Sequence, residues 1–83
     1  MILAHKDSKG KAWFFRIDAD RDAVARIART FRQLAVRANQ TKTVKAYSRA
    51  LLAESLTLKR YAKTNGATAE EFEAAPRDER FVI

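Results

Sequence analysis

The 83-residue chain contains no cysteine, one histidine, one proline and two glycines. The lack of cysteine excludes a disulfide framework, a thiolate zinc site and a thiol nucleophile. No apolar run approaches the roughly 18 residues that a membrane-spanning helix needs. The amino terminus turns polar at His5 and Lys6, which is too early for a secretion signal. We therefore expect a cytoplasmic protein that makes no contact with membranes.

The sequence motifs of common enzyme classes are missing as well. There is no glycine-rich nucleotide loop, no serine-hydrolase elbow and no paired-histidine zinc motif. His5 has no second histidine or cysteine with which it could hold a metal. Asp18, Asp20 and Asp22 alternate as in a calcium loop, but the glycine and the closing glutamate of such a loop are absent, so helix capping explains them better. The sequence predicts a protein that is not an enzyme and uses no cofactor and no metal.

A chain of this length suffices for one domain, since it buries only a little over half of the surface that it exposes when unfolded. We expect a single domain over residues 1–83. The segments on either side of Asp7-Ser8-Lys9-Gly10 are rich in aromatic and β-branched residues, which predicts a β-hairpin over residues 1–17. Alternation in its second strand places aromatic side chains on both faces of the hairpin, Trp13 and Phe15 on one and Phe14 on the other.

Apolar residues then recur at three- and four-residue steps, which predicts amphipathic helices over residues 20–39 and 43–65. We expect the second helix to bury Val44, Tyr47, Leu51, Leu58 and Tyr61 and to end at Asn65-Gly66 in a left-handed cap. Thr68 and Glu71 form a capping-box pattern that predicts a short helix over 68–75. Residues 76–83 are either a third strand beside the hairpin or an apolar tail. The predicted fold class is α+β, with the hairpin packed on two long amphipathic helices plus one short helix.

Positive charge is concentrated in the middle of the chain. The net charge is +7, but residues 23–63 contain ten basic residues against one acid, Glu54, for a net charge of +9. On the first long helix, at about 100° per residue, five arginines face away from the apolar stripe: Arg21, Arg26, Arg29, Arg32 and Arg37. Residues 23–40 contain no acid, so Arg29, Arg32 and Arg37 gain no pairs within the helix, and like charges one turn apart cost a few tenths of a kcal/mol. A partner outside the helix is expected to offset this cost.

The guanidinium group binds phosphate and carboxylate equally well, so two classes of partner remain open. The first is nucleic acid, bound through its backbone and without reading of sequence. The second is an acidic surface of a target protein, which would make the chain an interaction module or inhibitor. The basic residues expected to contact either partner are Arg26, Arg29, Arg32, Arg37, Lys45, Arg49, Lys59 and Lys63.

Leu52 and Leu56 lie off the apolar stripe of the second helix, among its basic residues. Such a ridge predicts a second packing surface, against the hairpin or against another chain, and would anchor a protein partner. A homodimer is a further alternative, because the apolar stripes are long for so small a monomer. In size and composition the chain is similar in type to the small accessory or inhibitor proteins of phages and other mobile elements.

Overall fold

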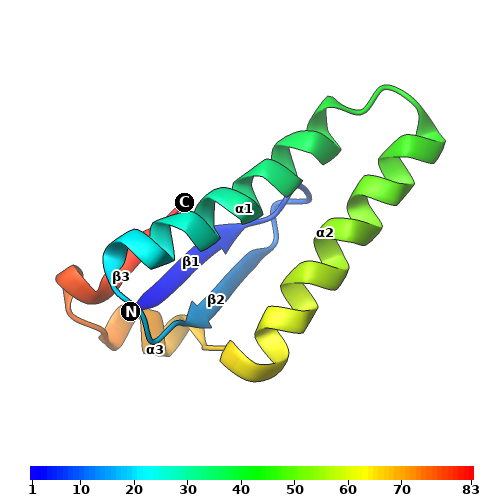
Figure 1. The fold of residues 1–83 in the computed structure, drawn as a ribbon. Coiled ribbons are helices and arrows are strands. Elements are labelled where there is room, and N and C mark those ends of the chain that lie inside the picture. The colour runs from blue at the N-terminus through cyan, green and yellow to red at the C-terminus, as the bar shows by residue number, and fades with distance from the viewer.

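A computed structural model describes all 83 residues (Figure 1). The elements follow one another as β1 (Ile2–Lys6), β2 (Ala12–Arg16), α1 (Arg21–Gln40), α2 (Val44–Asn65), α3 (Ala69–Ala74), a 3₁₀ turn (Arg77–Glu79) and β3 (Arg80–Val82). The predicted α+β class is confirmed, with the hairpin packed on two long helices and a third short one. None of the helices combines the length and apolarity that crossing a bilayer requires.

The three strands form one sheet in the order β2-β1-β3. β1 lies in the centre, antiparallel to β2 with Leu3 opposite Phe15, and parallel to β3 with Leu3 opposite Phe81. The hairpin turn contains Gly10 at a φ of +82°, a conformation that side chains with a Cβ rarely adopt. The C-terminal segment is thus a strand, the first of the two predicted alternatives.

Helices cover both faces of this sheet, because both faces carry aromatic side chains. α1 and α2 run antiparallel over one face (Figure 1). The hydrophobic core lies between these two helices and the sheet. It is formed by Leu3, Phe15, Ile17, Val24, Ala28, Phe31 and Leu58. On the opposite face, the Phe14 ring lies 5.5 Å from that of Phe72 in α3. The aromatic side chains of β2 therefore pack against helices on both faces of the sheet.

The α1–α2 hairpin extends well beyond the sheet, so that the molecule measures 42 × 22 × 19 Å (Figure 1). The five residues of β1 span about 17 Å, whereas the 22 residues of α2 span about 33 Å. The first turns of α2 therefore have no sheet beneath them. Val44 is 84% exposed and Tyr47 is 39% exposed, so the prediction that both are buried is wrong.

Local signals set the ends of the helices. Asp20 caps α1 by accepting a hydrogen bond from Ala23 N–H at 2.8 Å, and Thr43 caps α2 in the same way through Ala46 N–H. The predicted left-handed cap at Gly66 is wrong, because its φ is −63°. Glycine is needed there for space, since a Cβ at this position would lie 2.6 Å from the carbonyl oxygen of Ala62.

Candidate nucleic-acid interface

The candidate interface is the outer face of α1. Val24, Ala28 and Phe31 fix the orientation of the helix, because all three are buried against the sheet. The side chains on the opposite side of α1, at an average of about 140° round the helix from the three buried residues, point into solvent. Six of them line an open depression of about 720 Å³ on the second half of α1: Arg29, Arg32, Gln33, Val36, Arg37 and Gln40. We call these six residues the α1 outer face.

None of the predicted partner-binding side chains is engaged within the protein. All eight basic residues are exposed, and none of their side chains forms an ion pair or a hydrogen bond. The one ion pair of the molecule joins Arg16 to Glu71 at 2.6 Å and involves none of them. The four arginines on the outer side of α1 are therefore free to bind a partner.

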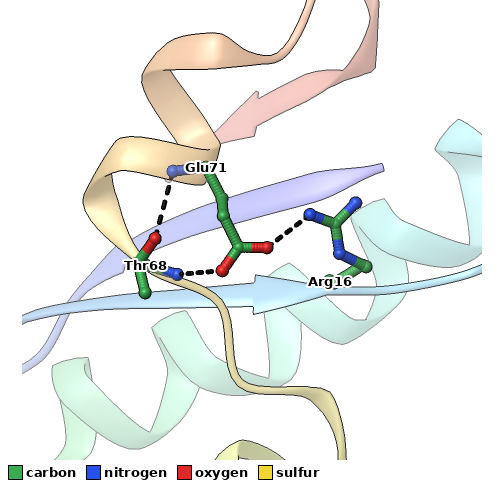
Figure 2. A network of polar contacts seen from close by, with 3 residues as sticks. All are labelled: Arg16, Thr68 and Glu71. Atoms are coloured by element: carbon green, nitrogen blue, oxygen red, sulfur yellow. Dashed lines mark hydrogen bonds and ion pairs between the residues drawn. The ribbon is translucent and has the colours of Figure 1, made fainter.

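Three arginines outside this set, Arg16, Arg21 and Arg80, stabilise the fold instead. Arg16 binds the Glu71 carboxylate, which also accepts a hydrogen bond from Thr68 N–H and completes the predicted capping box of α3 (Figure 2). The hydrogen bond from Arg16, followed by that from Thr68, holds the pKa of Glu71 below its usual value. Arg80 donates to the carbonyl of Ala75 at 2.8 Å.

Arg21 lies on the same half of α1 as the free arginines by sequence, but it has a different role. Its guanidinium donates to the carbonyl oxygens of Asp78 at 3.1 Å and Arg80 at 3.4 Å. These carbonyls belong to the turn before β3 and to the start of that edge strand, whose backbone groups would otherwise be open to another chain. Arg21 therefore protects the sheet edge and does not belong to the candidate interface.

The basic residues of α2 divide between two surfaces. Arg49 lies across from Arg37 of α1, and the two flank a groove of about 280 Å³ whose floor includes Ala46, Ala50 and Ala53. Ala46 and Ala53 lie about 120–140° round α2 from the buried Leu58, so this groove opens away from the sheet. The groove joins Arg49 to the arginines of α1.

Lys45, Lys59 and Lys63 lie further round α2, with Arg49 between them and the groove. They fall within about 60° of one another and of Leu52 and Leu56 on the helix surface. Leu52 is 59% exposed and Leu56 is 52% exposed, so this ridge packs on neither the hairpin nor any other element. We call these five residues the α2 ridge. The eight predicted basic residues thus form two groups, the α1 arginines with Arg49 and the lysines of the ridge, and the two groups adjoin at Arg49.

The chain was compared with protein-family models, curated proteins and solved structures. Nothing matches. The candidate interface therefore rests on its own geometry and chemistry.

Two polar groups, Glu54 and His5, are buried inside the fold. The Glu54 carboxylate is 3% exposed and accepts hydrogen bonds from Ser8 N–H at 3.1 Å and from the Ser8 hydroxyl at 2.5 Å, which ties the β-hairpin turn to α2. In the sequence, its position between Leu51 and Leu58, on the apolar side of α2, indicates that this acid is buried. Nearby, His5 packs on the Phe31 ring at 5.5 Å, and neither ring nitrogen has a hydrogen-bond partner.

Sequence reasoning missed three residues of the α1 outer face. The expectation of backbone binding alone took no account of amide side chains among the arginines. Gln33 and Gln40 lie among them, on either side of the exposed Val36. The three residues are spaced by three and four positions in the sequence, and this helical spacing indicates that they share one face of the helix.

Proposed function

We propose that the protein binds nucleic acid through the arginines of α1, which contact backbone phosphates. The observation that carries the proposal is that Arg26, Arg29, Arg32 and Arg37 are exposed on one helix and have no partner within the protein. Arg49 extends this positive surface across the groove between the two helices.

The energetics favour an anionic partner. Arg26, Arg29 and Arg32 follow one another at one helical turn, so their charges repel, and no acid of α1 beyond Asp22 offsets them. A polyanion supplies the missing negative charge at regular intervals and releases its own condensed counterions on binding. The planar guanidinium also binds phosphate with two parallel hydrogen bonds, which an ammonium group does not.

The test is a titration of fluorescent duplex DNA, single-stranded DNA and RNA at two salt concentrations. We compare the wild type with R26E/R29E/R32E, and use K45E/K59E/K63E as a control with the same change in net charge. We expect wild-type binding to weaken steeply with salt, and the arginine variant to lose it. If three phosphate contacts are lost, the slope of log K against log salt falls by about three.

The lysine variant makes the test independent of total charge. We expect it to keep most of the wild-type affinity and salt dependence, because its three lysines belong to the α2 ridge and none of them lies on α1. Equal losses in both variants would show that net charge alone drives binding. The absence of binding at low salt would contradict the proposal.

The α2 ridge favours a second candidate function, binding of an acidic protein surface. Leu52 and Leu56 are exposed side by side and have Lys45, Lys59 and Lys63 around them. An apolar centre with a charged rim is the usual anatomy of a protein interface. A target with an apolar pocket inside an acidic surface would match it, and binding would make the chain an interaction module or inhibitor.

Light scattering of the wild type and of L52E/L56E tests the ridge. A dimeric wild type and a monomeric variant would assign the ridge to a homodimer. If both are monomeric, the second candidate requires a protein whose complex with the wild type is at least about tenfold weaker with L52E/L56E. That complex is expected to survive R26E/R29E/R32E, and a partner lost in both variants would contradict the assignment to the ridge.

A further inference from the structure

The α1 outer face has a central row with an arginine on each side. Arg29, Gln33, Val36 and Gln40 follow one another at steps of four, three and four residues, and so form a row along the helix within about 60° of its circumference. Arg32 lies about 70° to one side of this row, and Arg37 about 70° to the other. All of these residues are exposed.

The row carries the side chains that distinguish base pairs in the major groove. Arginine pairs with the two acceptors of guanine, and glutamine pairs with the donor and acceptor of adenine. Val36 is 41% exposed in the middle of the row, and an apolar side chain at this place can contact the methyl group of thymine. The flanking arginines correspond to the two walls of the groove, each of which is a phosphate backbone.

The dimensions agree with this arrangement. The major groove of B-DNA is about 12 Å wide and admits one α-helix. Arg29 and Gln40 are separated by about 16 Å along the axis, which corresponds to about five base pairs at 3.4 Å each. The major groove of duplex RNA is too deep and narrow for side chains to read. The dimensions of the row therefore favour duplex DNA over duplex RNA.

We propose that α1 lies in the major groove of duplex DNA and reads its sequence, with Arg29, Gln33, Val36 and Gln40 on base edges. Arg32 and Arg37 bind the phosphates of the two strands, whereas Arg29, one of the four arginines of the proposed function, contacts a guanine instead of a phosphate. This inference rests on the proposed function, and adds to it the class of nucleic acid and the residues that determine specificity.

The experiment is a selection from a pool of DNA duplexes with a randomised segment of about ten base pairs, twice the length that the row spans. We expect the wild type to enrich a motif of about five base pairs that contains guanine and adenine. On that sequence, Q33A/Q40A is expected to lose at least about tenfold of the preference over a scrambled duplex. Its affinity for the scrambled duplex and its salt slope stay as in the wild type, because the phosphate contacts remain.

Asn39 provides the matched control. It is an exposed amide on the same helix, about 100° round from Gln40 and outside the row, so N39A is expected to keep the full preference. Circular dichroism of the three proteins shows whether the helices are retained.

Three results would overturn the inference. The first is no enriched sequence, the second is equal affinity for duplex DNA and duplex RNA, and the third is an equal loss of preference in N39A. In each case, salt-dependent binding that R26E/R29E/R32E abolishes would leave the proposed function standing. No binding to any nucleic acid would overturn both.

Discussion

At the scale of single residues, burial has its clearest chemical effect on His5. Its imidazole is 4% exposed, packs on Phe31 and has no hydrogen-bond partner. Burial in these surroundings lowers the pKa of His5 below its usual value of 6.5, although the charges of Glu54 and Asp7 act in the opposite direction. The folded protein therefore holds this side chain neutral at a pH where the unfolded chain protonates it.

This difference predicts how stability depends on pH. Below pH 6.5 the unfolded chain binds a proton at His5 before the folded protein does, so the free energy of unfolding decreases as the pH falls. Well above pH 6.5 the residue is neutral in both states and contributes no dependence. One proton gives a slope of at most about 1.4 kcal/mol per pH unit.

Urea unfolding at a series of pH values between about 5 and 8, the range in which histidine titrates, measures this slope. We expect H5L to show a flatter profile than the wild type, because leucine fills much of the site and does not titrate. H5L changes no other titratable group, so an unchanged slope in this variant would assign the dependence to another residue.

Glu54 is also a buried polar group but, unlike His5, it has hydrogen-bond partners. It is as buried as His5, but both of its carboxylate oxygens accept hydrogen bonds from Ser8, so the cost of desolvation is offset. It is also the one acid between residues 23 and 63. The acid that the sequence places among ten basic residues thus holds the fold and is not available to neutralise the surface.

At the scale of elements, the end of α2 depends on a close approach of two backbone segments. Gly66 N–H donates to the carbonyl of Ala62 at 3.0 Å, and the next residue, Ala67, donates to Phe14 of β2 at 2.9 Å. The end of the helix is therefore joined to the edge of the sheet. A side chain at Gly66 would push this residue away from the Ala62 carbonyl and so disturb the end of the helix and its bond to the sheet.

We expect G66A to lower the free energy of unfolding by about 1–3 kcal/mol, the usual cost of an added methyl group in a packed site. The Cβ would lie 2.6 Å from a backbone oxygen, which cannot rotate away. Hydrogen exchange is expected to rise at the end of α2 and at Ala67, and to change little at the Gly10 turn. A variant as stable as the wild type would contradict this account.

Most elements could be predicted from the sequence because their signals are local. The caps at Asp20 and Thr43, the capping box of Thr68 and Glu71, and the glycine turn at Gly10 each depend on residues within four positions. The role of Gly66 could not be predicted from local sequence. Glycine is required there because the Ala62 carbonyl leaves no space for a Cβ, whereas a glycine at a helix end is equally compatible with a left-handed cap.

At the scale of the whole molecule, the mismatch between short strands and long helices determines which apolar residues are buried. The stripe of α2 is periodic along its length, but only the part that lies over the sheet is covered. Leu58 is therefore fully buried, whereas Val44, on the same side of the helix, is almost fully exposed. Periodicity predicts a shared face, and the length of the neighbouring element determines its burial.

The same distinction applies to charge. The sequence by itself determined that positive charge gathers on α1 and α2, since helical spacing and the lack of acids are properties of the chain. Only the tertiary structure decided which of these residues share a surface. It placed Arg21 on the edge of β3, separated the lysines of the α2 ridge from the arginines of α1, and joined Arg37 to Arg49 across a groove. The physical reason is that spacing within a helix is set by local backbone geometry, whereas the partners of each face depend on contacts between segments distant in sequence.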